Sequence, residues 1–384
     1  MQRHRFVPRP AWQEKVTASG LRWHTDNGAP FWDESASYSF TAAEIARLSC
    51  TAAELHALCM EAIHHVIRTG AWQELCVSPQ DAPVVLASWE RGDFALYGRF
   101  DLLLDENGQA KFLEYNADTP TILLESSLTQ GDWVREVMPG ASQWNDVDSL
   151  LIAAWRDSGI RCAYFTWIPG ALEEEGTVRY LASTAEAAGV EAIVLPLTDI
   201  GWHRRHRLFV DSEGREVRHC FKLYPWEWIL RDPFALQIPA ASCRFIEPAW
   251  KHLLSNKALA ALLWKLFPDH PALVPCVLDG ALAAPSVVRK PVYGREGCNV
   301  EIRRHGTALH VTDGPYAGRC VEQAFVDAPR YDGFLPLACV WMIGGHPAGL
   351  GIREEEGPVT LNDSRFVPHF IADVPSTGAS AKIV

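Results

Sequence analysis

Two short runs of alternating residues carry the side chains best suited to chemistry in this chain. The runs cover residues 99–104 and 109–116, and Asn107-Gly108 between them is typical of a two-residue type I′ hairpin turn. On one face the expected cross-strand pairs are Asp101 with Glu114, Arg99 with Asn116, and Leu103 with Phe112. The other face carries Phe100, Leu102, Leu113 and Tyr115, which suit a core.

Two carboxylates in this hairpin are expected to face each other. Directly opposed residues have Cβ atoms about 4.5–5.5 Å apart, and two like charges ~5 Å apart repel by ~3 kcal/mol at an effective dielectric near 20. Mg²⁺ would offset the repulsion of Asp101 and Glu114, with the Asn116 amide as a further ligand. Arg99 on the same face suits phosphate or carboxylate. The alternative is a solvated polar face with an ion pair, but the polar, proline-fixed loop at residues 118–121 favours a chemical role.

A second candidate is a glycine-containing loop at residues 288–299. The chain has no Gly-x₄-Gly-Lys-Ser/Thr motif, so ATP would need another phosphate cradle. A strand ending at Lys290, followed by Gly294 and Gly297, would bring a cation and close-approaching backbone to phosphate oxygens. As a bare pattern this also fits an ordinary glycine loop beside a solvated lysine.

The composition describes a folded protein with an acidic surface. The 384 residues are enough for two or three domains, and a net charge of −12 disfavours nonspecific binding to nucleic acid or anionic membranes. Neither an export segment nor a run of 18 apolar residues is evident, and the ten cysteines are scattered singly. These features predict a cytoplasmic protein with reduced thiols.

The rest of the pattern predicts mixed helix and sheet. A helix is expected from a capping box at Thr51 and Glu54 to Gly70, with sheet from residue 83 to 116. Residues 159–222 suggest an α/β lobe, with strands at 162–168 and 191–195, a helix at 177–188 and a hairpin around 212–214. Beyond it we expect a helix at 256–267, strands at 287–291, 299–304, 320–326, 336–343 and 348–353, and a frayed end over the last ten residues.

Taken together, the motifs resemble a known enzyme family. Residues 97–105 and 112–121 resemble the metal-binding hairpin of ATP-grasp ligases, and more narrowly the synthetase domain of the glutathionylspermidine synthase family. Residues 254–259 resemble the site of the first ATP-binding lysine, and residues 288–299 resemble the mobile loop after the second. Residues 351–354 resemble the late arginine motif of the family.

The resemblance implies a role for each matching residue. Asp101, Glu114 and Asn116 would bind two Mg²⁺ ions, while Arg99 and Arg353 would act on the phosphates as catalytic residues. ATP would be bound by Arg99, Lys257, Lys290, Gly294, Gly297, Glu322, Gln323 and Arg353. Thr119 and Thr121 keep hydroxyls at glutathione-binding positions, and Arg295 would close over the reacting carboxylate.

The resemblance also implies a fold and a reaction. The fold would be α+β, a circularly permuted ATP-grasp fold with an additional α/β lobe, because the metal ligands precede the lysines. Its parts would be residues 1–158 with the hairpin, 159–250 as a substrate lobe and 251–384 as the ATP-binding lobe, without an amidase domain. We expect an ATP- and Mg²⁺-dependent acid–amine ligase acting through an acyl phosphate, with a carboxylic acid or peptide and a polyamine as substrates. The alternative is an idle nucleotide-binding or regulatory protein. Pro120 departs from the family loop, so the acid stays open, as does the amine.

Overall fold

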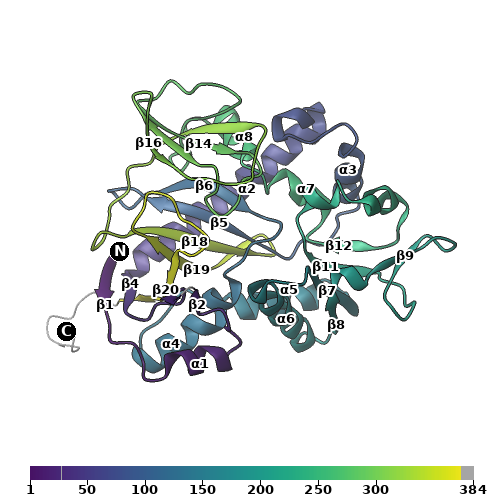
Figure 1. Ribbon diagram of the computed structural model, residues 1–384, viewed down its shortest axis with the longest axis horizontal. Helices are drawn as coiled ribbons and strands as arrows, with labels where there is room; N and C mark the ends of the chain where they lie inside the picture. Colours follow the sequence, from purple (N-terminus) through teal and green to yellow (C-terminus); the bar gives the residue numbers. More distant parts are fainter. Residues whose placement is uncertain (27, 373–384) are drawn as a thin grey trace.

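A five-stranded antiparallel sheet lies at the centre of the molecule (Figure 1). The computed structural model describes residues 1–26 and 28–372, and the expected frayed end lies outside them. Across the sheet the order is β20 (Arg365–Val367), β19 (His346–Glu355), β18 (Leu335–Ile343), β5 (Tyr97–Leu104) and β6 (Ala110–Asn116). None of the described helices is both long and apolar enough to span a membrane.

The long helix α2 (Ala42–Thr69) packs on β18 and β19 and begins earlier than expected. Thr41 and Glu44 form the capping box, whereas Thr51 and Glu54, in the same four-residue motif, lie inside the helix. The apolar stripe continues to the N-terminal side of Thr51, and its burial against the sheet extends the helix. Gly70 ends the helix with φ 68°, as predicted.

The expected strand at residues 83–86 is wrong, because this segment lies in helix α3 (Ala82–Glu90). Proline is well tolerated in the first helical turn, where its missing N–H has no partner to lose. The buried side chains Ala82, Val85 and Ser88 recur every three residues and face residues 249–253. The pattern of this short apolar run fits either a strand or a helix. Burial of one helical face against residues 249–253 favours the helix.

A second five-stranded sheet lies within residues 251–384, the part that the sequence predicts to bind ATP. Its order is β13 (Cys276–Leu278), β17 (Cys320–Ala324), β14 (Ser286–Pro291), β15 (Glu301–Arg304) and β16 (Thr307–Val311), with α8 (Ala258–Leu266) packed on β13 and β17. It docks on the open edge of β6: the Phe112 N–H donates to the Ala272 carbonyl at 2.8 Å, and the Gln323 side-chain amide donates to the Phe112 carbonyl at 2.9 Å. These contacts cover polar backbone that an edge strand would otherwise expose.

A four-stranded parallel sheet forms the expected α/β lobe. Its order is β12 (Arg244–Ile246), β11 (His219–Leu223), β7 (Cys162–Trp167) and β8 (Glu191–Pro196), with α5 (Val147–Asp157) and α6 (Leu172–Ala187) beside it. Helix α6 begins five residues before the predicted start at 177. A small hairpin, β9 (Gly201–His203) and β10 (Leu208–Val210), projects from this lobe, and α7 (Trp226–Ile229) and a 3₁₀ segment (Pro233–Ala240) follow β11.

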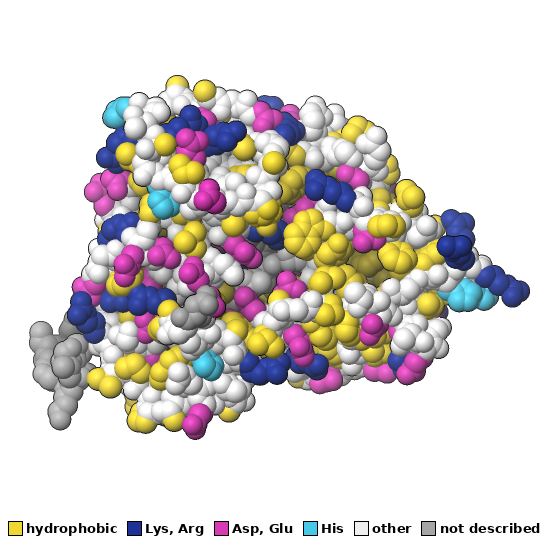
Figure 2. Space-filling model, viewed as in Figure 1, with side chains coloured by type: hydrophobic (Ala, Val, Ile, Leu, Met, Phe, Trp, Pro, Cys, Tyr) yellow, Lys and Arg dark blue, Asp and Glu magenta, His cyan; other side chains and the backbone are white. Residues whose placement is uncertain are grey.

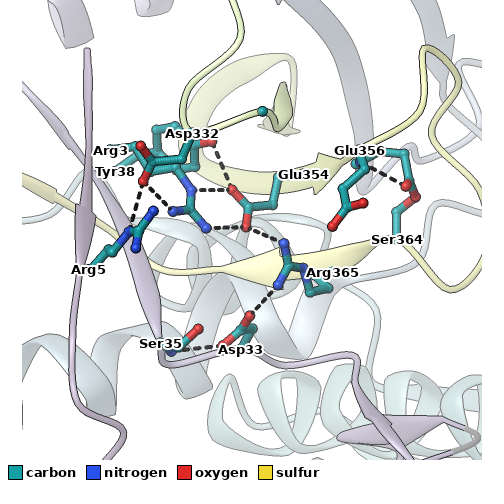
Figure 3. Close-up of polar contacts among 12 residues, drawn as sticks. Arg3, Arg5, Asp33, Ser35, Tyr38, Asp332, Glu354, Glu356, Ser364 and Arg365 are labelled. Atoms are coloured by element: carbon teal, nitrogen blue, oxygen red, sulfur yellow. Dashed lines mark hydrogen bonds and ion pairs between the residues drawn. The ribbon is translucent and has the colours of Figure 1, made fainter.

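The N-terminal segment is tied to the central sheet by a buried ionic network (Figure 3). This segment contributes β1 (Gln2–Arg5), α1 (Trp12–Ala18), β2 (Thr25–Asp26), β3 (Ala29–Pro30) and β4 (Ala36–Phe40). Strands β1 and β4 form a sheet with β21 (His369–Ile371). Helix α4 (Gln130–Val137) lies beside β21. Glu354 of β19 accepts two hydrogen bonds from Arg3, both 2.8 Å, and one from the Tyr38 hydroxyl at 2.8 Å. Arg365 lies 3.1 Å from the same carboxylate. The network fixes β19 at Glu354, the neighbour of Arg353, which is a predicted site residue.

A buried ion pair joins the hairpin to the parallel lobe. The Asp118 carboxylate pairs with Lys222 of β11 and accepts the Trp226 N–H at 2.8 Å, and both charged side chains are at most 1% exposed. Because Asp118 lies directly before Thr119, this pair holds the loop that contains two predicted substrate residues.

Replacing Lys222 with Met should therefore destabilise the fold strongly. It leaves the Asp118 carboxylate buried without its countercharge, which typically costs about 3–5 kcal/mol. Lys265→Met is the matched control, since Lys265 is 62% exposed and its pair with Glu74 should contribute less than about 1 kcal/mol. Urea unfolding followed by tryptophan fluorescence measures both, and equal losses for the two variants would contradict the importance of the buried pair.

Candidate active site

One cavity of about 370 Å³ collects nearly all the residues singled out in the sequence. The surface is hollowed near the middle of the molecule, with acidic side chains at the rim (Figure 2). The predicted residues that line the cavity are Arg99, Asp101, Glu114, Asn116, Thr119, Thr121, Lys257, Lys290, Gly294, Arg295, Gly297, Gln323 and Arg353. Glu322 is not among them.

The hairpin places its polar pairs as expected. Asp101 lies opposite Glu114 and Arg99 opposite Asn116. Arg99 donates to both Asp101 oxygens, at 2.7 and 2.9 Å, and the Asn116 amide donates to Asp101 at 3.0 Å and to Glu114 at 3.1 Å. The two carboxylates thus converge on one point of the cavity wall.

The turn of this hairpin differs from the prediction. Asp105 pairs with Gln109 through a 2.9 Å backbone bond, so the loop has three residues and ends at Gly108 with φ 71°. A three-residue loop with glycine in the left-handed region is the next most common hairpin connection after the two-residue turns.

A β-bulge corrects the register between the turn and the site. Leu102 pairs with Phe112 and Asp101 with Glu114, so Leu113 is the extra residue. The expected pairing of Leu103 with Phe112 is therefore wrong. Phe112 is buried in the core, and Leu113, expected in the core, lines the cavity beside Glu114.

Two lysines of residues 251–384 approach Glu114. Lys257 lies 2.7 Å from the carboxylate and donates to the Gly294 carbonyl at 2.5 Å, while Lys290 donates to the Leu113 carbonyl at 3.3 Å. Burial would raise the pKa of Glu114, but Lys257 and Lys290 lower it to about 2. Burial lowers the pKa of Lys290, a cost that an anion in the cavity would relieve.

The glycine loop and a C-terminal segment meet over the cavity. Gly297 has φ 69°, and a Cβ atom there would lie 2.5 Å from the Thr360 carbonyl oxygen, so only glycine fits. Arg353 donates from Nη2 to the carbonyls of Leu361, Asn362 and Ser364 at 2.7–2.9 Å. The Arg353 Nε atom is buried without a partner among the described residues, and the Arg353 side chain lines the cavity.

Glu322 and Gln323 point in opposite directions, as successive strand residues do. Gln323 lines the cavity, whereas Glu322 accepts the Leu282 N–H at 2.9 Å and pairs with Arg303. The expected contact of Glu322 with nucleotide is therefore not supported by its position.

Arg295 lies in the loop that the sequence predicted to close over substrate. It donates to the Thr119 hydroxyl at 3.2 Å, pairs with Glu227 and stacks 5.7 Å from the Trp228 ring. The sequence did not indicate Glu227 as a site residue. Arg99 donates to the Thr121 carbonyl at 2.7 Å, so both threonines of the loop are held by arginines.

Three further carboxylates line the cavity and were not anticipated: Glu173, Glu174 and Glu296. Burial, with Glu173 and Glu296 adding to it, raises the pKa of Glu174 to about 7. The run Glu173-Glu174-Glu175 could have indicated these cavity carboxylates from the sequence. It lay outside the expected helix because the predicted start of that helix was too late.

The hairpin has donors that fit Mg²⁺, which is held by carboxylate and amide oxygens. Among the described residues no group of three or more His, Cys, Asp and Glu side chains could hold a metal, so the candidate set is two carboxylates, Asp101 and Glu114, with the amide of Asn116. A half-turn of the Asn116 amide would present its oxygen in place of its nitrogen. The donor set therefore fits a hard divalent cation.

Comparison with known proteins agrees with the sequence resemblance. A relative from Haemophilus influenzae, provisionally named an acid–amine ligase, is 35% identical and matches 95% of this chain and 98% of its own length. Trypanothione synthetase of Crithidia fasciculata is 30% identical, and the bifunctional glutathionylspermidine synthetase/amidase of Escherichia coli is 28% identical, each over 82% of this chain. The chain spans only 53% and 56% of those two proteins.

A solved structure with a similar fold and a matching family model agree with these relatives. A glutathione synthetase-like effector from Globodera pallida has a similar fold, with a TM-score of 0.53 at 10% identity over 96% of this chain and all of that one. The family model described as glutathionylspermidine synthase preATP-grasp matches residues 3–372. This chain therefore belongs to the glutathionylspermidine synthase preATP-grasp family and is an ATP-dependent C–N ligase.

Proposed function

We propose that this ligase joins a carboxylic acid or peptide to a polyamine, with ATP and Mg²⁺, through an acyl phosphate. The observation that carries the proposal is the single cavity in which the Asp101 and Glu114 carboxylates lie beside Lys257 and Lys290. Such a mixture of anions and cations suits a nucleotide–metal complex. The order of these residues supports a circularly permuted ATP-grasp fold, with parts at 1–158, 159–250 and 251–384.

One end of the cavity has side chains that suit a nucleotide. Apolar side chains would contact the adenine from the two sheets, namely Leu103, Leu113, Val288, Ile302, Phe325 and Leu337. Gly294 and Gly297 allow the backbone to come close to phosphate oxygens. Lys257 and Lys290 would neutralise the phosphate charge.

Phosphoryl transfer depends mainly on positioned charge. Arg99 and Arg353 face the same cavity as the lysines, and each is held by carbonyl or carboxylate partners that fix its guanidinium. In the proposal they would stabilise the negative charge that develops on the transferred phosphoryl group. Mg²⁺ held by Asp101, Glu114 and Asn116, two ions in our proposal, would supply further charge neutralisation to the phosphates.

Acid and amine would occupy the remaining wall of the cavity. Thr119, Thr121 and Arg295, which line this wall, would bind the acid and its carboxylate. Glu173 and Glu296 lie in the same wall and would attract a cationic amine. An idle nucleotide-binding protein would have no use for this acidic wall, which favours the enzyme. The free thiols of all ten cysteines agree with a cytoplasmic location.

The direct test is ADP release by the purified protein over a panel of acids and amines. We expect turnover only when an acid and an amine are both present, with kcat/KM for spermidine falling as salt rises and exceeding that for a neutral amine. ATP hydrolysis that never responds to any amine would favour the idle nucleotide-binding alternative instead.

Lys290→Ala should weaken ATP binding without unfolding the protein. Loss of one phosphate-facing cation should raise Kd about tenfold, equivalent to about 1.4 kcal/mol. Calorimetry with a nonhydrolysable ATP analogue measures this value. Arg289→Ala is the control, because Arg289 is the exposed neighbour on β14. Unchanged affinity in the Lys290 variant would refute its assignment.

Glu114→Gln should abolish the advantage that Mg²⁺ gives to nucleotide binding. The wild type should bind the ATP analogue on the order of tenfold more tightly with Mg²⁺ than with EDTA. The variant should bind equally in both, because one charged ligand is gone. Glu106→Gln, at the exposed tip of the turn, should behave as wild type. A full Mg²⁺ effect in Glu114→Gln would place the metal elsewhere.

A further inference from the structure

The proposed reaction needs a proton acceptor that none of the residues assigned above supplies. A primary alkylamine enters at neutral pH as an ammonium ion, which has no lone pair and cannot attack a carbonyl carbon. A carboxylate or another base must take its proton at the cavity. Lysines and arginines cannot do so while they carry charge.

Most carboxylates of the cavity are already engaged. Asp101 is paired with Arg99 and Glu114 with Lys257, and Glu227 behind the wall is paired with Arg295. Against the effect of burial, the paired cations lower the pKa of Glu114 and of Glu227, which makes these two carboxylates poor proton acceptors. Burial raises the pKa of Glu173, against the charges of Arg353 and Arg99, but those two arginines place it near the groups assigned to phosphate.

The surroundings of Glu174 differ from those of the carboxylates that are paired with a cation. Glu174 lines the cavity and, like Glu173 and Glu296, has no ion pair within 4.0 Å among the described residues. Glu173 lies nearer Arg353 and Arg99. Glu296 lies on the glycine loop, whereas Glu174 lies in the first turn of α6. The charges that face it are Glu173 on its own helix and Glu296 and Arg295 on the glycine loop. With burial, the two acidic neighbours outweigh the arginine and bring its pKa to about 7.

The helix start is built to hold this residue in place. A Cβ atom on Gly176 would lie 2.2 Å from the Trp23 ring, so the first turn of α6 rests directly on that ring. The Trp23 N–H donates to Glu125 at 2.7 Å, and the second Glu125 oxygen is buried without a partner among the described residues. Burial, with the charge of Glu173 adding to it, raises the pKa of Glu125 to about 8. The first turn of α6 is therefore fixed by packing, beside two carboxylates, Glu125 and Glu174, whose pKa values are raised by burial.

Resting on the proposed function, we propose that Glu174 is the general base of the amide-forming step. Its carboxylate takes one proton from the ammonium group, and the freed lone pair attacks the acyl carbon. The C–N bond forms as the bond from that carbon to the phosphate oxygen breaks, and phosphate leaves with the electron pair. The second proton on nitrogen leaves with phosphate or water, which gives a neutral amide.

The test compares two nucleophiles in the Glu174→Gln variant. Spermidine needs a base, whereas hydroxylamine is already neutral at pH 7 and does not. With an acid that supports wild-type turnover, the variant should lose on the order of 100-fold in kcat with spermidine and less than about threefold with hydroxylamine. Glu175→Gln, at the adjacent residue that pairs with Arg179 and does not line the cavity, should lose little with either.

The pH profile gives a second readout. A base must be ionised to accept a proton, so wild-type kcat/KM with spermidine should rise with pH through about 7, and this limb should be absent in Glu174→Gln. Glu174→Asp, with a shorter carboxylate, should recover part of the rate and keep the limb.

Three results would overturn the assignment: equal losses with both nucleophiles, an unchanged pH limb, or a raised KM for spermidine with normal kcat. If the wild type makes no product from any acid and amine, the proposed function itself fails and Glu174 has no such role. Thermal melting of Glu174→Gln and Glu175→Gln checks that both variants fold alike.

Discussion

The opposed carboxylates of Asp101 and Glu114 impose the constraint on which the rest of the site depends. At their separation they would repel by ~3 kcal/mol in an effective dielectric near 20. The protein offsets this with Arg99 on one side and Lys257 on the other, bridged by the Asn116 amide. Under the proposed function, the cations that stabilise the hairpin are therefore the ones that would bind phosphate.

The edge of β6 links this arrangement to the second five-stranded sheet. The bulge at Leu113 turns two successive carbonyls outward, and they accept hydrogen bonds from Gln323 and Lys290. Strand β19 provides the other side of the cavity, with Arg353 facing inward and Glu354 locked to Arg3 and Tyr38. The hairpin proposed to bind metal and the side chains proposed to bind phosphate are thus joined by hydrogen bonds and ion pairs in one framework.

Sequence patterns predicted the site better than they predicted its supports. The pairing of Asp101 with Glu114 was right although the turn was wrong, because the three-residue loop and the bulge shift the register in opposite directions. The first residues of helices were harder to predict from the sequence, because they depend on the burial of side chains against strands that are distant in the chain. The late predicted start of α6 hid Glu174, and no local pattern shows which strand residue, Glu322 or Gln323, faces the cavity.

A crystal structure with Mn²⁺ and a nonhydrolysable ATP analogue would test the account most directly. Mn²⁺ replaces Mg²⁺ at oxygen-ligand sites and can be located by its anomalous scattering. The account predicts manganese peaks bonded to oxygens of Asp101, Glu114 and Asn116, with Lys257 and Lys290 on the phosphates. Manganese bound only elsewhere, with Lys257 still paired to Glu114 and no phosphate near either lysine, would contradict it.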